Sequence, residues 1–383
     1  MSVEFLKIID NAKDTTVVVF SSANVPPNKF SAIHALRDFN ANLVFINCPD
    51  NNWYIKPIPG LGNSVSEVSQ NIIEAIKSLG TKRSIFYGGS MGAYGAILYG
   101  ALCHGDKAIV TGVEAELGAE GGYYNSLCRD KLEKTLRPNL TSILASSAIK
   151  TDILIGEACF SDHIFVQSLR KFDFVKIRTI TNGGHRVPPF IDRKIGLRNL
   201  IESMLHDTED ELLKNISTDI IGNCEAYNEI RNALINKTLS KEEVKKLKEY
   251  VNLPSSNQHF KSYAFFALSL VQTDNIGKTE LIEKAIELNE SNYLFLDYMS
   301  ETQKELGRID KALYYAQKCA DVIEDTGFES SEFYMLKTIV LLEVSGQIER
   351  AKNLLSVIEK TIPSHGKMRE NFDAIASRLN RVC

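Results

Sequence analysis

The first half of the chain alternates short apolar, β-branched runs with segments of helical periodicity. One such segment, SVSEVSQNIIEAIKSLG, places Val65, Val68, Ile72 and Ile76 on one helical face and stops at Gly80. Strands that are apolar throughout and separated by helices are typical of a parallel sheet covered on both faces. The sequence therefore predicts an α/β fold, with strands over residues 15–22, 42–48, 83–89, 107–113, 152–158 and 175–182.

The second half has a different pattern. After residue 207 the β-type runs disappear apart from the short TDIIG, and helical periodicity continues to the end. We therefore expect two domains, an α/β domain over residues 1–207 and an all-α domain over residues 208–383.

An internal repeat marks the helical half. Gly307 and Gly346 are 39 residues apart, as are Ala312 and Ala351, and each alanine follows its glycine by the same spacing. Over roughly residues 260–365 this pattern resembles tetratricopeptide repeats, although their usual period is about 34 residues. The resemblance implies helix-turn-helix units that either offer a surface for a protein partner or for self-association, or simply cap the α/β domain.

Composition limits the possible partners. The chain has 44% hydrophobic and 24% charged residues and a net charge of −4, without a block of like charges, so neither nucleic acid nor an anionic membrane is expected as a partner. No apolar run approaches the ~20 residues needed to span a bilayer, and the N-terminus does not resemble a secretory signal. The seven cysteines form no C-x-x-C pair, which predicts reduced thiols in a cytoplasmic protein without a metal site.

A G-x-S-x-G pattern follows the third predicted strand. In YGGSMGAYGA, Gly88 and Gly92 flank Ser90 at −2 and +2. Such a serine can sit on a sharp strand-to-helix turn that presents its Oγ as a nucleophile. The alternative is an ordinary turn in which the serine caps the helix N-terminus.

A base and an acid follow in the expected order. His185 comes after the last predicted strand, between two glycines and two prolines, and is the candidate base. Asp162, after the preceding strand, is the first candidate for the acid that orients the imidazole, and Glu157 is the second. A third choice is the pair Glu114 and Glu116, after the fourth strand.

Other loops supply candidates for substrate contacts. The backbone N–H of Met91, together with that of Ser22 or Ala23, would bind a developing oxyanion. Trp53 and Tyr54 lie after the second strand and either line the substrate pocket or pack beneath the loop. The same two possibilities hold for Tyr123 and Tyr124 in a longer insert, residues 114–150, which could cover the pocket.

The order Ser90, Asp162, His185, each after a separate strand, resembles that of α/β-hydrolases over residues 15–205. The first two antiparallel strands of that fold look absent. The stretches NNWYIKPIPGLGNSV and FYGGSMGAYGAILYG also resemble hydrolase-like proteins fused to helical repeats in bacterial surface-polysaccharide and glycosylation contexts.

The resemblance implies acyl transfer to water through an acyl-enzyme, without a metal or organic cofactor. We expect a serine esterase that acts on a small or carbohydrate-linked ester. Two alternatives stay open: an acyltransferase or peptidase that uses the same three residues, and a catalytically silent hydrolase domain that acts through its helical repeats.

Overall fold

The computed structural model describes residues 2–218, 224–326, 331–363 and 366–381. The chain divides into two compact units, Met1–Asp219 and Ile220–Cys383. Beyond the expected boundary at residue 207, helix α9 (Glu209–Leu213) is followed by strand β9 (Ser217–Thr218), which pairs with the sheet of the first unit. The sheet of the first unit therefore includes residues beyond 207.

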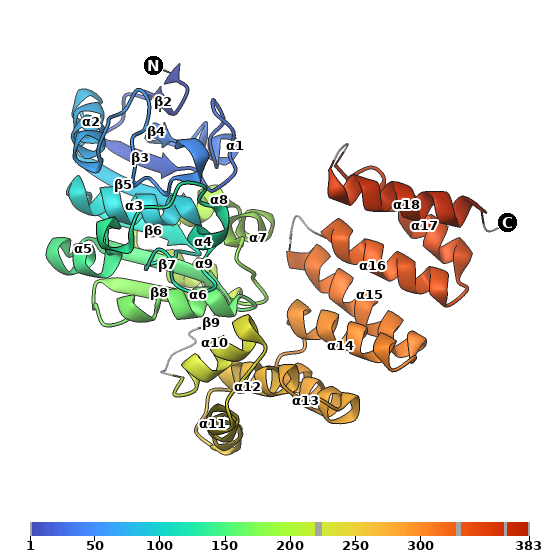
Figure 1. The fold of residues 1–383 in the computed structure, drawn as a ribbon. Helices are drawn as coiled ribbons and strands as arrows, with labels where there is room; N and C mark the ends of the chain where they lie inside the picture. The colour runs from blue at the N-terminus through green and yellow to red at the C-terminus, as the bar shows by residue number, and fades with distance from the viewer. Residues whose placement is uncertain (1, 219–223, 327–330, 364–365, 382–383) are drawn as a thin grey trace. The chain divides into compact units, whose positions relative to one another are not determined.

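A nine-stranded sheet forms the centre of the first unit (Figure 1). The six predicted strands are confirmed and run parallel to one another. The expectation that the initial antiparallel strands are absent is wrong, because β2 pairs antiparallel with β4 and β1 pairs with β2. In spatial order the strands are β1 (Ser2–Val3), β2 (Leu6–Ile9), β4 (Asn42–Ile46), β3 (Thr15–Phe20), β5 (Arg83–Gly89), β6 (Lys107–Thr111), β7 (Lys150–Gly156), β8 (Val175–Ile180) and β9.

Helices cover both faces of this sheet and create two hydrophobic cores. Side chains alternate between the cores along each strand, as in β3, where Val18 and Phe20 join one core and Val17 and Val19 join the other. The first core is completed by helices α2 (Val65–Ser78), α3 (Met91–Leu102) and α5 (Leu140–Ser147). The second is completed by α1 (Ile33–Leu36), α7 (Val187–Lys194), α8 (Leu197–Leu205) and α9.

The insert of residues 114–150 is fastened to the first unit by a buried carboxylate. Glu114 is only 2% exposed. Its Oε2 accepts the backbone N–H of Tyr124 at 2.9 Å, and its Oε1 accepts that of Gly118 at 3.4 Å. The segment held in this way includes the short helix α4 (Tyr123–Leu127). Burial raises the pKa of Glu114 to about 7, although these backbone donors and nearby His185 act in the opposite direction.

The second unit consists of consecutive helices. Gly307 and Gly346 occupy equivalent turns with φ of 71° and 75°, a left-handed conformation that suits glycine. Ala312 and Ala351 are fully buried. These helices are α10 (Tyr227–Asn236), α11 (Lys241–Asn252), α12 (Gln258–Leu270), α13 (Asn275–Leu288), α14 (Tyr293–Glu305), α15 (Ile309–Thr326), α16 (Ser331–Val344), α17 (Ile348–Ile358) and α18 (Lys367–Arg381).

Within the described ranges, no helix has the length and apolar character needed to cross a membrane. The cysteines that fall in those ranges are all free thiols, and Cys383 lies outside them.

Because Glu114 is buried, we expect the stability of the protein to depend on pH, and we expect Glu114→Gln to remove this dependence. Because its folded-state pKa of about 7 exceeds the ordinary 4.5, the stabilisation from the protonated form is complete below about pH 4.5 and is lost as pH rises through about 7. As pH rises from about 5 to about 8, the wild type should lose this stabilisation, whereas Glu114→Gln has no proton to lose. We therefore expect the free energy of unfolding of Glu114→Gln to increase relative to that of the wild type over this range. The shift sets an upper limit of roughly 3 kcal/mol on this gain.

Fluorescence of Trp53, the only tryptophan, reports unfolding of the first unit, because its ring packs on Tyr124 at 5.4 Å. Urea titrations at about pH 5 and about pH 8 give the free energies of unfolding of each protein. The control is Glu116→Gln, which removes an exposed carboxylate from the same insert. An equal pH response in the wild type and Glu114→Gln would contradict the prediction.

Candidate active site

Ser90 lies on a strained turn between β5 and α3. Its backbone has φ 55° and ψ −120°, a region that non-glycine residues rarely occupy. Its N–H donates to the carbonyl oxygen of Thr111 at 2.8 Å. Its side chain makes no capping hydrogen bond to the helix. The alternative of a serine that merely caps α3 is therefore not supported, and its hydroxyl is available for other partners.

The glycines on either side make this turn possible. A Cβ on Gly88 would lie 2.1 Å from the carbonyl oxygen of Gly92. A Cβ on Gly92 would lie 2.2 Å from the carbonyl oxygen of Phe20, at the end of β3. Both distances are far below any van der Waals contact, so a larger residue at either position would displace the backbone. The N-terminus of α3 therefore packs directly against the end of β3.

The structure brings Ser90, His185 and Asp162 together. His185 follows β8, and Asp162 lies on the short helix α6 (Phe160–Phe165) after β7. The Nε2 atom of His185 is 2.9 Å from Ser90 Oγ. The Nδ1 atom is 2.9 Å from Asp162 Oδ1 and 3.2 Å from Oδ2. The Asp162 side chain is fully buried, and that of His185 is 16% exposed.

Close backbone contacts hold the His185 loop. A Cβ on Gly156, at the end of β7, would lie 2.2 Å from the carbonyl oxygen of Gly184. Gly183 accepts the N–H of Ala158 at 2.8 Å. On the imidazole itself, a Cβ on Gly112 would approach Nδ1 and Cε1 to 3.1 Å. The missing Cβ of Gly112 therefore leaves space that the imidazole of His185 uses.

The other candidate acids have different partners. Glu157 accepts the backbone N–H of Asn182 at 2.9 Å, in the loop that leads to His185, and burial raises its pKa. Glu114 anchors the insert, and Glu116 pairs with Lys134 at 3.3 Å. Of the acids considered from the sequence, Asp162 is the one hydrogen-bonded to the imidazole.

The candidate oxyanion donors are the backbone N–H groups of Met91, Ser22 and Ala23. Met91 is the first residue of α3, where backbone N–H groups have no acceptor within the helix. Ser22 does not offer its N–H, because it donates to Ser31 Oγ at 3.0 Å, and its own Oγ donates to the carbonyl of Gly89. Ala23 is the remaining candidate on this loop.

The residue after Ala23 is fixed by a pair of amides. Asn24 donates its backbone N–H to Asn51 Oδ1 at 2.7 Å, and Asn51 Nδ2 donates to Asn24 Oδ1 at 2.8 Å. These two bonds connect the loop after β3 with the loop after β4, which contains the 3-10 helix η1 (Pro49–Asn51). Ala23 therefore lies between two residues, Ser22 and Asn24, whose backbone N–H groups are both hydrogen-bonded.

Trp53 and Tyr54 do not line a surface open to a ligand. They are 1% and 0% exposed. The hydroxyl of Tyr54 donates to the carbonyl of Ser21 at 2.7 Å, and its ring fills the space left by Gly95. The pocket-lining prediction is therefore corrected: these residues pack beneath the loop, where the small residues of α3 leave room for large rings.

An aromatic residue of the insert contacts the imidazole. The Tyr123 ring stacks on that of His185, with centroids 4.0 Å apart and planes 26° from parallel. Its hydroxyl lies 3.7 Å from Cys159 Sγ. Tyr123 is a candidate from the sequence, but 62 residues separate it from His185. No local sequence pattern therefore indicates that the two rings stack.

Cys159, Asp162 and His185 offer ligand atoms within 4.8 Å of one another. The 2.9 Å between His185 Nδ1 and Asp162 fits a hydrogen bond, whereas two ligands on one zinc at about 2.0 Å would lie roughly 3.3 Å apart. Burial raises the pKa of the Cys159 thiol well above its ordinary value, which opposes the thiolate that metals bind. The distance between His185 and Asp162 therefore fits a hydrogen bond better than two ligands of one metal ion.

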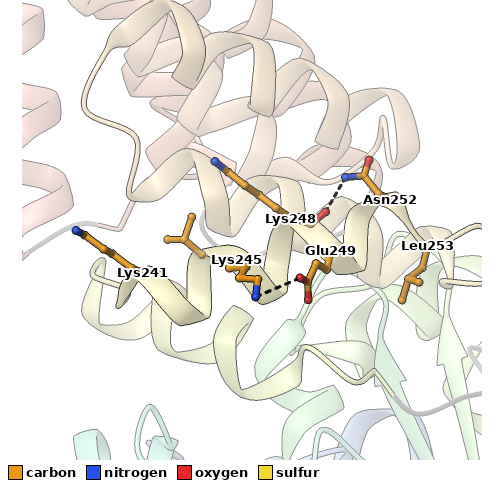
Figure 2. A pocket seen from close by; sticks show the side chains of 7 residues that line it. Lys241, Lys245, Lys248, Glu249, Asn252 and Leu253 are labelled. Carbon is orange, nitrogen blue, oxygen red and sulfur yellow. Dashed lines mark hydrogen bonds and ion pairs between the residues drawn. The ribbon is translucent and has the colours of Figure 1, made fainter.

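Two cavities in the structure lie elsewhere. One of about 650 Å³ lies along α11 and is lined by Lys241, Lys245 and Lys248 among others (Figure 2). Another of about 380 Å³ lies where β5, β6 and β7 begin, the opposite edge of the sheet from Ser90. Neither of these two includes Ser90 or His185 in its walls.

Chemically, the arrangement can move a proton. An imidazole nitrogen at 2.9 Å can accept the proton of Ser90 Oγ as that oxygen attacks an electrophile. The buried carboxylate of Asp162 then faces the positively charged imidazolium and stabilises it. This combination suits reactions that pass through a covalent intermediate on an oxygen nucleophile.

No family model and no curated protein matches the chain. Among solved structures, the capsule O-acetyltransferase of Neisseria meningitidis serogroup A is similar over 54% of this chain and 93% of that chain, with 16% identity and a TM-score of 0.42. MenH from S. aureus is similar over 54% and 98%, with 15% identity and a TM-score of 0.35. The Glycosylation Associate Protein (Gap123) complex from Streptococcus agalactiae is similar over 55% and 44%, with 14% identity and a TM-score of 0.37.

The strand order and the serine turn determine the fold assignment. A mostly parallel sheet with an antiparallel N-terminal edge carries the strained serine between a central strand and a buried helix. The first unit has an α/β-hydrolase fold, and an all-α unit follows it.

Proposed function

We propose that this protein is a serine esterase that cleaves a small acyl ester or a carbohydrate-linked ester. One observation carries the proposal: His185 lies within 2.9 Å of both Ser90 Oγ and Asp162 Oδ1, through its two different ring nitrogens. A histidine that connects a hydroxyl to a buried carboxylate in this way is the arrangement that activates serine for acyl transfer.

The reaction proceeds in two halves. His185 Nε2 removes the Oγ proton as Ser90 attacks the ester carbonyl carbon, and the imidazolium then gives that proton to the departing alcohol. This leaves an acyl group on Ser90. A water molecule, deprotonated by His185, attacks the carbonyl carbon of the acyl-enzyme. The bond from that carbon to Ser90 Oγ then breaks, the imidazolium returns its proton to Oγ, and the acid product leaves.

Two backbone donors bind the oxyanion of each tetrahedral intermediate. The N–H of Met91, at the start of α3, is the first, and it acts with the positive end of the helix dipole. The second is the N–H of Ala23, because Ser22 already donates its own to Ser31. The packing of Gly92 on the end of β3 brings the two loops together.

We assign the helical unit a docking or self-association role. Its equivalent turns at Gly307 and Gly346 and its buried Ala312 and Ala351 support the tetratricopeptide-like repeat predicted from the sequence. The three proposed catalytic side chains all belong to the first unit, and the helical unit supplies none of them.

Replacement of the nucleophile tests the proposal directly. We expect Ser90→Ala to lower the hydrolysis of a short-chain nitrophenyl ester by at least roughly 10³-fold, because no covalent intermediate can form. Intact-mass measurement after treatment with a fluorophosphonate should show one adduct on the wild type and none on the variant. Trp53 fluorescence checks that the fold survives.

The matched control is Ser66→Ala, which removes an exposed hydroxyl on α2. Full activity in Ser90→Ala would contradict the proposal, and an unlabelled wild type would favour a catalytically silent domain. Adding sugars as acyl acceptors and testing the corresponding amides distinguishes hydrolysis of esters from acyl transfer and from peptidase activity.

The choice of acid is tested by a pair of isosteric variants. We expect Asp162→Asn to lower kcat by roughly 10³- to 10⁴-fold, because a neutral amide cannot stabilise the imidazolium. Glu157→Gln should stay within a few-fold of the wild type, because its amide oxygen can still accept the Asn182 N–H. Steady-state kinetics on the same ester measures both, and a reversed order would reassign the acid to Glu157.

A further inference from the structure

We propose that Tyr123 is a positioning residue for His185, and that its aromatic face, supplied by the insert, keeps the imidazole aligned and stabilises the imidazolium form. The proposal rests on the esterase function above, because it concerns the base of that reaction. It goes further by giving the insert a part in the chemistry.

The contact is a face-to-face stack. The ring centroids of Tyr123 and His185 are 4.0 Å apart, with the planes 26° from parallel. Phe165 meets the Tyr123 ring edge-on at 6.5 Å, and the Tyr123 hydroxyl lies 3.7 Å from Cys159 Sγ. Cys159 and Phe165 flank Asp162 in sequence, so the segment that holds the acid also holds the tyrosine.

The backbone next to Tyr123 is also fixed. Tyr124 is fully buried, and its N–H donates to Glu114 at 2.9 Å. Its ring packs on Trp53, and its hydroxyl accepts the N–H of Leu132 at 2.9 Å. The tyrosine over the imidazole is therefore carried on an anchored segment.

The stack fits the two tasks of the base. In the resting enzyme the imidazole must point one nitrogen at Ser90 and the other at Asp162, and a ring lying flat on it opposes rotation away from that plane. When Ser90 Oγ gives its proton to Nε2, the ring becomes a cation, which an aromatic face within about 6 Å attracts. Both effects act on catalysis and neither requires contact with substrate.

Tyr123→Leu tests the aromatic face, and Tyr123→Phe serves as the conservative comparison. We expect the leucine variant to lower kcat and kcat/KM together by roughly 10-fold, with KM unchanged, because the lost interaction is strongest in the transition state. The phenylalanine variant keeps the ring and should stay within about 3-fold of the wild type. Ser66→Ala, an exposed change on α2, is again the control.

A second measurement does not depend on turnover. The proton shared by His185 Nδ1 and Asp162 should give a downfield proton NMR resonance in the wild type and in Tyr123→Phe. In Tyr123→Leu we expect this resonance to broaden, because the uncovered imidazole moves and exchanges its proton with water. Trp53 fluorescence melts confirm that each variant is folded.

The outcomes separate this proposal from the function on which it rests. A wild type that neither hydrolyses esters nor reacts with the fluorophosphonate overturns the esterase, while the resonance still tests the positioning of His185. An active wild type matched by Tyr123→Leu in kcat and in the resonance overturns the role of Tyr123.

Two further outcomes would change the interpretation of Tyr123. If Tyr123→Phe loses as much activity as Tyr123→Leu, the effect belongs to the hydroxyl and not to the aromatic face. If Tyr123→Leu raises KM and leaves kcat unchanged, Tyr123 binds substrate and does not position His185.

Discussion

The active-site geometry depends on how closely α3 approaches the end of β3. A side chain on Gly92 would overlap the carbonyl of Phe20, so the helix can begin there only because that position lacks a Cβ. With the helix so close, the chain must turn sharply after β5, and Ser90 is held at φ 55° and ψ −120°. Such a backbone costs about 1–3 kcal/mol, which the burial of nearly every residue of α3 offsets.

A parallel sheet then determines where the partners of Ser90 come from. The carboxyl ends of β5, β7 and β8 lie at the same edge, so the loops that follow them converge there. Convergence alone does not orient an imidazole, which can rotate about two bonds. The backbone at Gly112 and the ring of Tyr123 restrict His185, and the second of these belongs to an insert outside the repeating strand-helix pattern.

Features encoded in one continuous stretch were predictable from the sequence. The parallel strands are apolar runs, and the turn around Ser90 has its glycines at fixed offsets. The edge strand β2 has only four residues, LKII, and Lys7 interrupts its apolar run, so the run is too short to be recognised. The burial of Tyr54 depends on the space beside Gly95, and the stack on His185 depends on an insert folding back. These contacts join residues far apart in sequence, and no local pattern reports them.

The carboxylates near this edge of the sheet are distinguished by which N–H groups they receive. Glu114 and Glu157 both accept backbone N–H groups, so each is used to fix a loop, and burial raises the pKa of both. Asp162 is fully buried, and its carboxylate receives the N–H of a side chain, His185. A backbone amide cannot become a cation, whereas an imidazole can. The attraction between Asp162 and His185 therefore grows as the imidazole takes up a proton, which is the condition for an acid that assists a base.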